Sequence, residues 1–299
     1  MSSIPHITVC ICTFKRPGLL RKTVEGVLGQ KTGDSFTFSI VVVDNDVARS
    51  AEATIAAIRG FSSTLISYDV EPVQNIALAR NRAILHAESD FIAFIDDDEI
   101  PNHDWLHLLF LSLREYMVDG VLGPVLPAFE QKPADWIRKG EFFDRPRHES
   151  GFILPWTKCR TGNVLFKREI LQGEEAFRRE FGSGGEDRDF FIRMIEHGRR
   201  FAWCDEAIVQ EVVPSVRCNP SFMLRRALLR GKAAVQHKNG MRDLAKSAFA
   251  VIAYLLALPI AALLGRHKAM KVLIRTCDHA GKLLAWCGLN PIREKYVLE

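Results

Sequence analysis

The 299-residue chain has little of what marks unstructured or repetitive proteins. Its 13 prolines and 20 glycines leave no room for a long low-complexity tract, and no internal repeat is visible. Apolar residues make up 47% of the chain and charged residues 25%. This balance excludes intrinsic disorder, collagen and coiled coil. A chain of this length can bury a sizeable core, as one large domain or two small ones.

The sequence also lacks a CxxC pair and any Cys/His spacing typical of zinc sites. Its start, MSSIPHITVC, lacks the basic region and long apolar core of a signal peptide. The seven cysteines form an odd set, in which Cys10 and Cys12 are expected to pack on one face of a strand. We therefore expect reduced thiols in a cytoplasmic protein.

Charge is unevenly distributed, although the net charge is only +4. Between Ser215 and Lys282 there are 13 Lys or Arg residues and two acids, a net charge of +11, while the rest of the chain carries −7. This asymmetry indicates an anionic partner, with nucleic acid and anionic membrane as the usual candidates. Because the basic segment has few aromatic residues on which bases could stack, we expect no nucleic-acid partner.

Short apolar runs alternate with helical patterns in the first hundred residues. Strands are expected at residues 6–12, 38–43, 65–70 and 91–95, and helices at 19–30, 50–59 and 76–87. Such alternation with short connections predicts an α/β fold, with a mostly parallel central sheet flanked by helices on both faces. Ligands of these sheets bind beyond the carboxyl ends of the strands, where Thr13, Asp44 and Asp96 are expected.

The pattern is looser after Asp104. We expect a helix at 105–115, a strand at 120–126, a loop region with a short helix at 127–155, a strand at 162–167, a helix at 187–197 and a closing strand at 201–213. The chain is basic and helical from Pro214 onward. The sequence therefore predicts a domain over residues 1–213 and a helical C-terminal extension over residues 214–299.

Four adjacent acids, Asp96 to Glu99, follow an apolar strand directly. Adjacent carboxylates repel one another unless a cation neutralises them. Their hard oxygen atoms suit Mg²⁺ or Mn²⁺, and Mg²⁺ commonly combines one or two carboxylates with substrate phosphates. The alternative is a solvated turn or an N-cap for a helix entered at Pro101.

A second acidic motif is Gly184-Gly185-Glu186-Asp187. Glycine lets the backbone approach a ligand closely, and a carboxylate on such a loop beside a metal-nucleotide site is a candidate general base. The alternative is an N-cap with a first-turn acid, which helix termini favour anyway. Taken without its neighbours, the motif favours this second interpretation.

These motifs together resemble those of family 2 glycosyltransferases with the GT-A fold. The matching stretches are TVCICTFKRPGLLRKTV, IVVVDND, NIALARNRAI, DFIAFIDDDE, GNVLFKRE and GGEDRDFF, which occur in the family's order between Ile7 and Val213. Within the family, VLGPV, RTGNVLF and MLRRALLRG are most similar to glucosyltransferases of succinoglycan-type exopolysaccharide assembly.

The resemblance implies a role for each matching residue on the donor side. Thr13 and Arg16 would lie against the nucleotide, and Asp44 would accept the uracil imide N–H. Arg80 would approach the base or the phosphates, and Asp97 would contact the ribose. Asp98 would hold the metal on the diphosphate, with Asp96 completing the D-x-D pattern.

On the acceptor side, the resemblance implies that Asp187 deprotonates the acceptor hydroxyl and that Glu186 orients the acceptor sugar. In the family, a His near the end of the closing strand often ligates the metal. This chain has Gln210 and Glu211 there, which leaves the third metal ligand open. The Q-x-x-R-W signature of processive members is absent, which favours the addition of a single sugar.

The function so implied is inverting, metal-dependent transfer of a hexose, with glucose favoured, from a UDP-sugar. The acceptor would be a hydroxyl of a lipid-linked saccharide in bacterial surface polysaccharide assembly, at the cytoplasmic face of the inner membrane. The metal would neutralise charge on the departing diphosphate. The alternative is a non-catalytic nucleotide- or membrane-binding adaptor that retains the GT-A fold.

The basic C-terminal segment contains 17 uncharged residues in a row, Ala248 to Leu264. This run is at the lower limit for a membrane-spanning helix, and Pro259 interrupts it. Because basic residues flank both sides, we favour an interfacial or re-entrant hairpin over a span. A buried C-terminal helix is the third alternative. Arg226, with Arg225 and Arg230, forms either a diphosphate or lipid-phosphate contact or a solvated basic face.

Overall fold

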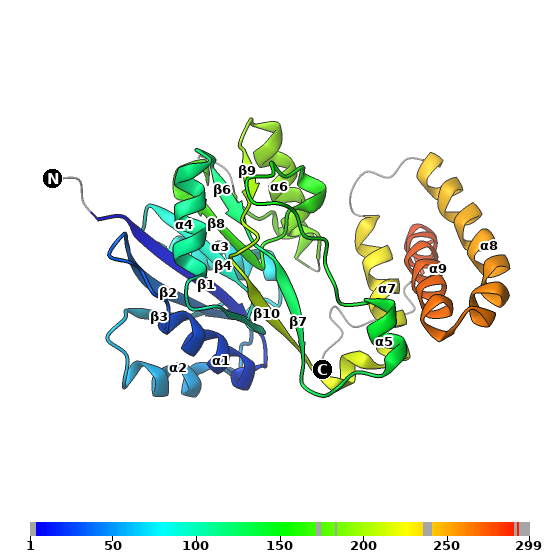
Figure 1. The fold of residues 1–299 in the computed structure, drawn as a ribbon, viewed down its shortest axis with the longest axis horizontal. Coiled ribbons are helices and arrows are strands. Elements are labelled where there is room, and N and C mark those ends of the chain that lie inside the picture. The colour runs from blue at the N-terminus through cyan, green and yellow to red at the C-terminus, as the bar shows by residue number, and fades with distance from the viewer. Residues whose placement is uncertain (1–3, 172–174, 183, 236–240, 290–291, 293–299) are drawn as a thin grey trace. The chain divides into compact units, whose positions relative to one another are not determined.

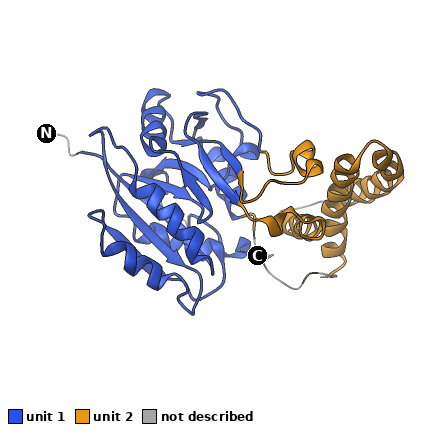
Figure 2. Cartoon of the chain, turned by 60° about the horizontal axis from the view of Figure 1, so that its bottom comes forward, with its two compact units in different colours: residues 1–127, 145–182, 186–212 blue, residues 128–144, 183–185, 213–299 orange. Residues whose placement is uncertain are grey.

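A computed structural model of the protein describes residues 4–171, 175–182, 184–235, 241–289 and 292. The chain divides into two compact units, which Figure 2 distinguishes by colour. The first unit comprises residues 1–127, 145–182 and 186–212, and the second comprises residues 128–144, 183–185 and 213–299. Each unit is described by itself.

The first unit is built on a mixed sheet in which the first four strands of the chain, β1 to β4, are parallel (Figure 1). Strand β1 pairs in parallel with β2 and β4, and β2 pairs in parallel with β3, whereas β8 is antiparallel to both β4 and β6. Among the described residues the order is β3 (Ile66–Val70), β2 (Thr37–Asp44), β1 (His6–Thr13), β4 (Phe91–Ile95), β8 (Asn163–Lys167), β6 (Gly120–Leu122) and β9 (Phe201–Trp203).

Helices cover both faces of this sheet. One face packs under α1 (Pro17–Leu28), α2 (Glu52–Arg59) and α4 (Trp105–Glu115), and the other under α3 (Ile76–Leu85) and α6 (Glu186–Glu196). Strand β1 serves both cores, because Ile7, Val9 and Ile11 point to the first while Cys10 points to the second. Cys12 packs beside Cys10, as expected, and all seven cysteines of the chain are free thiols.

The carboxyl ends of the parallel strands meet at one edge of the sheet. Thr13, the last residue of β1, is in register with Asp44 at the end of β2. Strand β4 lies on the other side of β1 and ends at Ile95, so the acids from Asp96 onward leave the same edge. The α/β fold and the convergence of these polar motifs are therefore confirmed.

Two stretches expected as single strands are in fact each divided between two sheets. Residues 120–126 break at Gly123-Pro124, because Pro124 has no N–H to donate to a ladder. Residues 201–213 break at the turn that begins at Cys204, where the Ala207 N–H donates to the Cys204 carbonyl. The second halves, β7 (Val125–Phe129) and β10 (Val209–Val213), form a small sheet in the order β5-β10-β7.

The third strand of the small sheet is β5 (Glu99–Pro101), which pairs with β10. The alternative that the four adjacent acids Asp96 to Glu99, here called the acidic tetrad, cap a helix entered at Pro101 is therefore wrong, since helix α4 begins at Trp105. Short 3₁₀ turns connect the other elements, at Trp156–Lys158, Arg168–Leu171, Arg179–Phe181 and Ser215–Cys218.

The second unit is helical. It contains α5 (Asp135–Gly140), α7 (Pro220–Ala234), α8 (Met241–Leu263) and α9 (Arg266–Trp286), and α9 packs against the other three. The backbones of α7 and α9 approach closely, because a Cβ on Gly231 would lie 2.1 Å from the Asp278 carbonyl oxygen and one on Gly281 would lie 2.3 Å from that of Leu228. Helix α8 continues through Pro259.

Candidate active site

Hydrogen bonds and ion pairs from the end of β1 and the loop after it hold the acidic tetrad in place. The Thr13 hydroxyl donates to Asp97 Oδ2 at 2.7 Å, and Arg16 Nη1 lies 3.3 Å from both Asp97 Oδ1 and Asp98 Oδ2. Burial raises the pKa of Asp97 to about 7, against the opposing effect of the Arg16 guanidinium. The structure thus brings together four of the predicted donor-site residues, which are Thr13, Arg16, Asp97 and Asp98.

Arg80 links the two acidic motifs. Its buried guanidinium forms an ion pair with Glu186 Oε1 and lies 3.5 Å from Asp96 Oδ1. Its guanidinium carbon also lies 5.5 Å from the ring centre of Phe177. Burial raises the pKa of Glu186 to about 7, and only one of its carboxylate oxygens has a hydrogen-bond partner among the described residues. Two motifs 90 residues apart therefore share one electrostatic site.

Sequence reasoning missed Arg145. Its guanidinium lies 2.5 Å from Glu211 Oε2 and 3.9 Å from Glu99 Oε1, so two buried carboxyl groups share one positive charge. Glu211 is buried opposite Glu99 in the β10–β5 pair, whereas Gln210 is exposed. Of the two residues considered for the third metal ligand, Glu211 is thus the one on the acidic side. The sequence signal for Arg145 is that residues 127–155 are rich in charge. That pattern does not show which acid the arginine would pair with.

The residues of the tetrad suit a divalent cation. Asp96 is half-exposed, and the buried Oε1 atom of Glu99 has no hydrogen-bond partner among the described residues. Gly162 leaves space here, because a Cβ would lie 2.7 Å from Glu99 Oε1 and 3.0 Å from Asp96 Oδ2. No three His, Cys, Asp or Glu side chains within the described residues form a ready group of ligands. A cation held by one or two carboxylates and substrate phosphates needs no such group.

Asp187 lies in the first turn of α6 and is half-buried. Gly184 and Gly185, which precede the helix, have φ values of +127° and +96°, a region that L side chains rarely adopt. This explains the two glycines, although Ser183 in the same loop lies outside the described residues. The Arg188 N–H donates to Asp187 Oδ1 at 2.7 Å, and the role of Asp187 as a base stays a prediction.

Asp44 is fully buried, and its carboxylate is supplied with donors from the chain itself. It accepts hydrogen bonds from the backbone N–H of Asp46 at 3.1 Å, from that of Ala51 at 2.8 Å, and from the Tyr68 hydroxyl at 3.1 Å. Burial nevertheless raises its pKa. The structure shows Asp44 shaping the loop after β2, and its contact with a base stays a prediction.

The arginines of α7 belong to the second unit. Arg230 forms a double ion pair with Asp278 of α9, with both nitrogen–oxygen distances at 3.1 Å. Arg230 therefore joins two helices, although its side chain is 55% exposed. The choice between a phosphate contact and a solvated basic face stays open for this arginine. The nucleotide-sugar contact expected of Arg226 stays a prediction.

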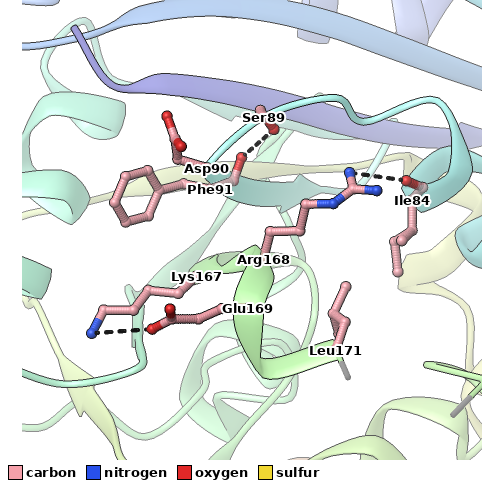
Figure 3. A pocket seen from close by; sticks show the side chains of 8 residues that line it. All are labelled: Ile84, Ser89, Asp90, Phe91, Lys167, Arg168, Glu169 and Leu171. Atoms are coloured by element: carbon pink, nitrogen blue, oxygen red, sulfur yellow. Dashed lines mark hydrogen bonds and ion pairs between the residues drawn. The ribbon is translucent and has the colours of Figure 1, made fainter. Parts of the chain in front are cut away.

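A surface pocket of about 700 Å³ lies at the opposite edge of the sheet (Figure 3). Phe91 at the beginning of β4 and Lys167 at the end of the antiparallel β8 line it, together with Asp90, Arg168 and Glu169. Lys167 Nζ lies 3.9 Å from Glu169 Oε1, and Arg168 donates to the Ile84 carbonyl. Its charges are thus partly paired with each other, and the acidic tetrad does not line it.

Comparison with known proteins agrees with this geometry. A model of "Glycosyl transferase family 2" matches residues 8–173. Succinoglycan biosynthesis protein ExoM of Rhizobium meliloti is 33% identical over 97% of this chain and 95% of its own length. Hyaluronan synthase of Pasteurella multocida is 26% identical over 67% of this chain, which spans 24% of that protein.

A solved structure of S. aureus TarS in complex with UDP-GlcNAc is similar in fold. It matches 96% of this chain and 93% of its own, with a TM-score of 0.54 and 13% sequence identity.

Proposed function

Because the chain belongs to glycosyl transferase family 2, we propose that it transfers a hexose from a UDP-sugar to a hydroxyl of a lipid-linked saccharide during surface polysaccharide assembly. Glucose is the favoured sugar. The observation that carries the proposal is the Asp96–Arg80–Glu186 connection, which joins a D-x-D motif at a strand end to acids at a helix start. The names of ExoM and of the UDP-GlcNAc complex support the acceptor pathway and the donor class.

The reaction is one in-line displacement. The acceptor oxygen forms a bond to the anomeric carbon, the bond from that carbon to the diphosphate breaks, and the acceptor proton passes to Asp187. UDP leaves with the electron pair, and the anomeric configuration is inverted. Arg16 and Arg80 place fixed positive charge beside the acids where the diphosphate would lie.

Mg²⁺ or Mn²⁺ would be held by Asp98 and Asp96, with Glu211, which lies opposite Glu99 in the β10–β5 pair, as the candidate for the third ligand. When bound, the cation would neutralise charge on the diphosphate. Asp97 accepts hydrogen bonds from Thr13 and Arg16, and it would also accept one from a hydroxyl of the ribose. Asp44 would support the uracil side of the site, and Arg226 would contribute to the nucleotide-sugar contacts.

The proposed location is the cytoplasmic face of a bacterial inner membrane, with residues 1–213 as the catalytic domain and 214–299 as the attachment. One helix of the described residues, over Asp243–Leu263, is long and apolar enough to span by length and composition. Phe249, Leu256 and Leu263 are 74%, 74% and 89% exposed. Such an apolar surface with basic flanks suits an interfacial or re-entrant hairpin on an anionic leaflet.

The test is transfer by the purified full chain from a panel of UDP-hexoses to a lipid-linked saccharide, with and without a chelator. We expect one donor to give product only when Mg²⁺ or Mn²⁺ is present, and the new linkage to have the opposite anomeric configuration by NMR. Absence of both transfer and UDP release with every donor would favour the adaptor alternative. Full activity in excess chelator would remove the metal from the proposal.

A further inference from the structure

A 3₁₀ turn beside the second acidic motif carries an aromatic ring with no role in the reaction described above. The turn Trp156–Lys158 packs against α6, the helix that begins with Glu186 and Asp187. The guanidinium carbon of Arg188 lies 4.9 Å from the ring centre of Trp156. Because Arg188 directly follows Asp187, this cation–π contact fixes the ring close to the proposed base.

The Arg188 guanidinium lies over this ring. Its Nε atom is enclosed and has no hydrogen-bond partner among the described residues. A buried polar atom without a partner has an energetic cost, which the contact with Trp156 partly offsets. Trp156 itself is half-buried, with part of its surface against the core of the first unit. Part of the residue therefore remains exposed to solvent.

Two cations follow Trp156, one at the end of the same turn and one two residues beyond it. Lys158 and Arg160 are exposed, and the Arg160 guanidinium folds back to donate to the Cys159 carbonyl at 2.6 Å. Burial raises the pKa of the Cys159 thiol to about 12, while Arg160 lowers it and Asp187 raises it further. Arg160 and Asp187 therefore both lie within electrostatic reach of the same sulfur atom. The segment that begins with the turn packed against α6 thus carries an aromatic ring and two exposed cations.

We propose that Trp156, Lys158 and Arg160 form the acceptor subsite, and that the acceptor saccharide carries a negative charge near its accepting hydroxyl. This inference rests on the proposed function. The apolar face of a sugar ring would cover Trp156, in the way that ligand sites combine an aromatic wall with a few polar groups. The anionic group, either an acidic sugar substituent or a diphosphate, would bind Lys158 and Arg160.

The experiment separates binding of the acceptor from handling of the donor. Acceptor KM is measured with octyl β-glucoside, octyl β-glucuronide and an alkyl glucosyl diphosphate, and UDP release to water is measured without acceptor. Trp156→Ala should raise the acceptor KM about tenfold for all three probes, and Trp156→Phe should restore most of the loss. UDP release to water should stay within about twofold in both variants.

A double variant tests the charge. Lys158→Ala with Arg160→Ala should raise the acceptor KM about tenfold for the anionic probes only. The anionic probe whose KM rises more shows whether the charge belongs to an acidic sugar substituent or to a diphosphate. Trp136→Ala is the matched control, because Arg266 also lies 4.9 Å from that ring, and it should leave KM unchanged.

The outcomes distinguish this inference from the function on which it rests. Unchanged acceptor KM in Trp156→Ala, or parent enzyme that neither binds nor glycosylates any of the probes while still releasing UDP, would overturn the subsite. Equal losses for neutral and anionic probes in the double variant would overturn the negative charge. No UDP release by the parent chain with any donor would instead overturn the proposed function.

Discussion

In the first unit Ile7, Val9 and Ile11 of β1 are fully buried, whereas in the second unit Phe249, Leu256 and Leu263 of α8 are 74%, 74% and 89% exposed. Both segments are apolar runs, but the sequence predicts a buried strand for the first and favours an interfacial or re-entrant hairpin for the second. A central strand is covered on both faces by helices, while α8 packs along one side against α9. The difference is that α8 leaves an apolar face exposed within its own unit, which is the observation behind the membrane attachment proposed above.

If catalysis depends on the first unit, the largest effect is expected from Asp98→Ala, which should lose transfer of the sugar. Asp98 is buried beside Arg16, three residues after the end of β4. Removing its carboxylate should lower transfer by at least about a thousandfold, since the cation that would neutralise the diphosphate loses a ligand. Circular dichroism and membrane partitioning should match the parent, because neither depends on this side chain.

Asp104→Ala is the control for Asp98→Ala, since Asp104 is an exposed acid just before α4 that pairs only weakly with Lys31 at 3.6 Å. It should retain the activity of the parent. Transfer by Asp98→Ala within tenfold of the parent would show that the tetrad is a structural turn.

The next effect concerns the base. Asp187→Asn keeps the size of the side chain and removes its ability to accept a proton, so kcat should fall by about 10² to 10⁴. The KM for the donor should change little, because Arg16 and Arg80 are untouched. A fall of only a few-fold would move the base to another group, with Glu186 the first to examine.

A smaller effect tests the exposed face of α8. Ile252→Glu with Leu256→Glu should lower membrane partitioning by about 10- to 100-fold, because two side chains lose the apolar transfer that anchors them. Transfer to a water-soluble acceptor should stay within about twofold. Flotation with anionic vesicles gives the first quantity, and UDP release gives the second.

Leu85→Glu is the matched control for α8, because Leu85 is 76% exposed on α3 of the first unit. Its partitioning should equal that of the parent. If the two α8 substitutions behave like Leu85→Glu, the exposed apolar side chains of α8 do not contact a membrane. The exposure of α8 would then not support membrane attachment.

The sequence predicts the parts of this site that depend on local pattern. The strand ends at Thr13 and Asp44 follow from short apolar runs that stop at polar residues. It does not predict Arg145 beside Glu211, because that contact joins residues 66 positions apart through a strand that changes sheets. Nor does it predict that Asp44 is enclosed, since its donors include the hydroxyl of Tyr68, a residue of a neighbouring strand.

The smallest expected effect is a pH dependence that buried Glu186 gives to the first unit. Burial raises its pKa from the ordinary 4.5 to about 7, against the opposing effect of Arg80. In the unfolded chain the carboxyl returns to its ordinary value. Between about pH 4.5 and 7 the folded state therefore holds a proton that the unfolded state has released. The free energy of unfolding must fall as the pH rises through this window.

Glu186→Gln removes this titration, so the parent should lose stability relative to the variant by on the order of 2 kcal/mol between pH 5 and 7.5. Melting curves of the two proteins should thus diverge by several degrees as the pH rises. Glu196→Gln is the control, because Glu196 is exposed at the end of the same helix α6, and its curves should run parallel to those of the parent. Parallel curves for Glu186→Gln as well would mean that Arg80 keeps the buried carboxyl ionised throughout, and that Glu186 faces the acceptor as a fixed negative charge.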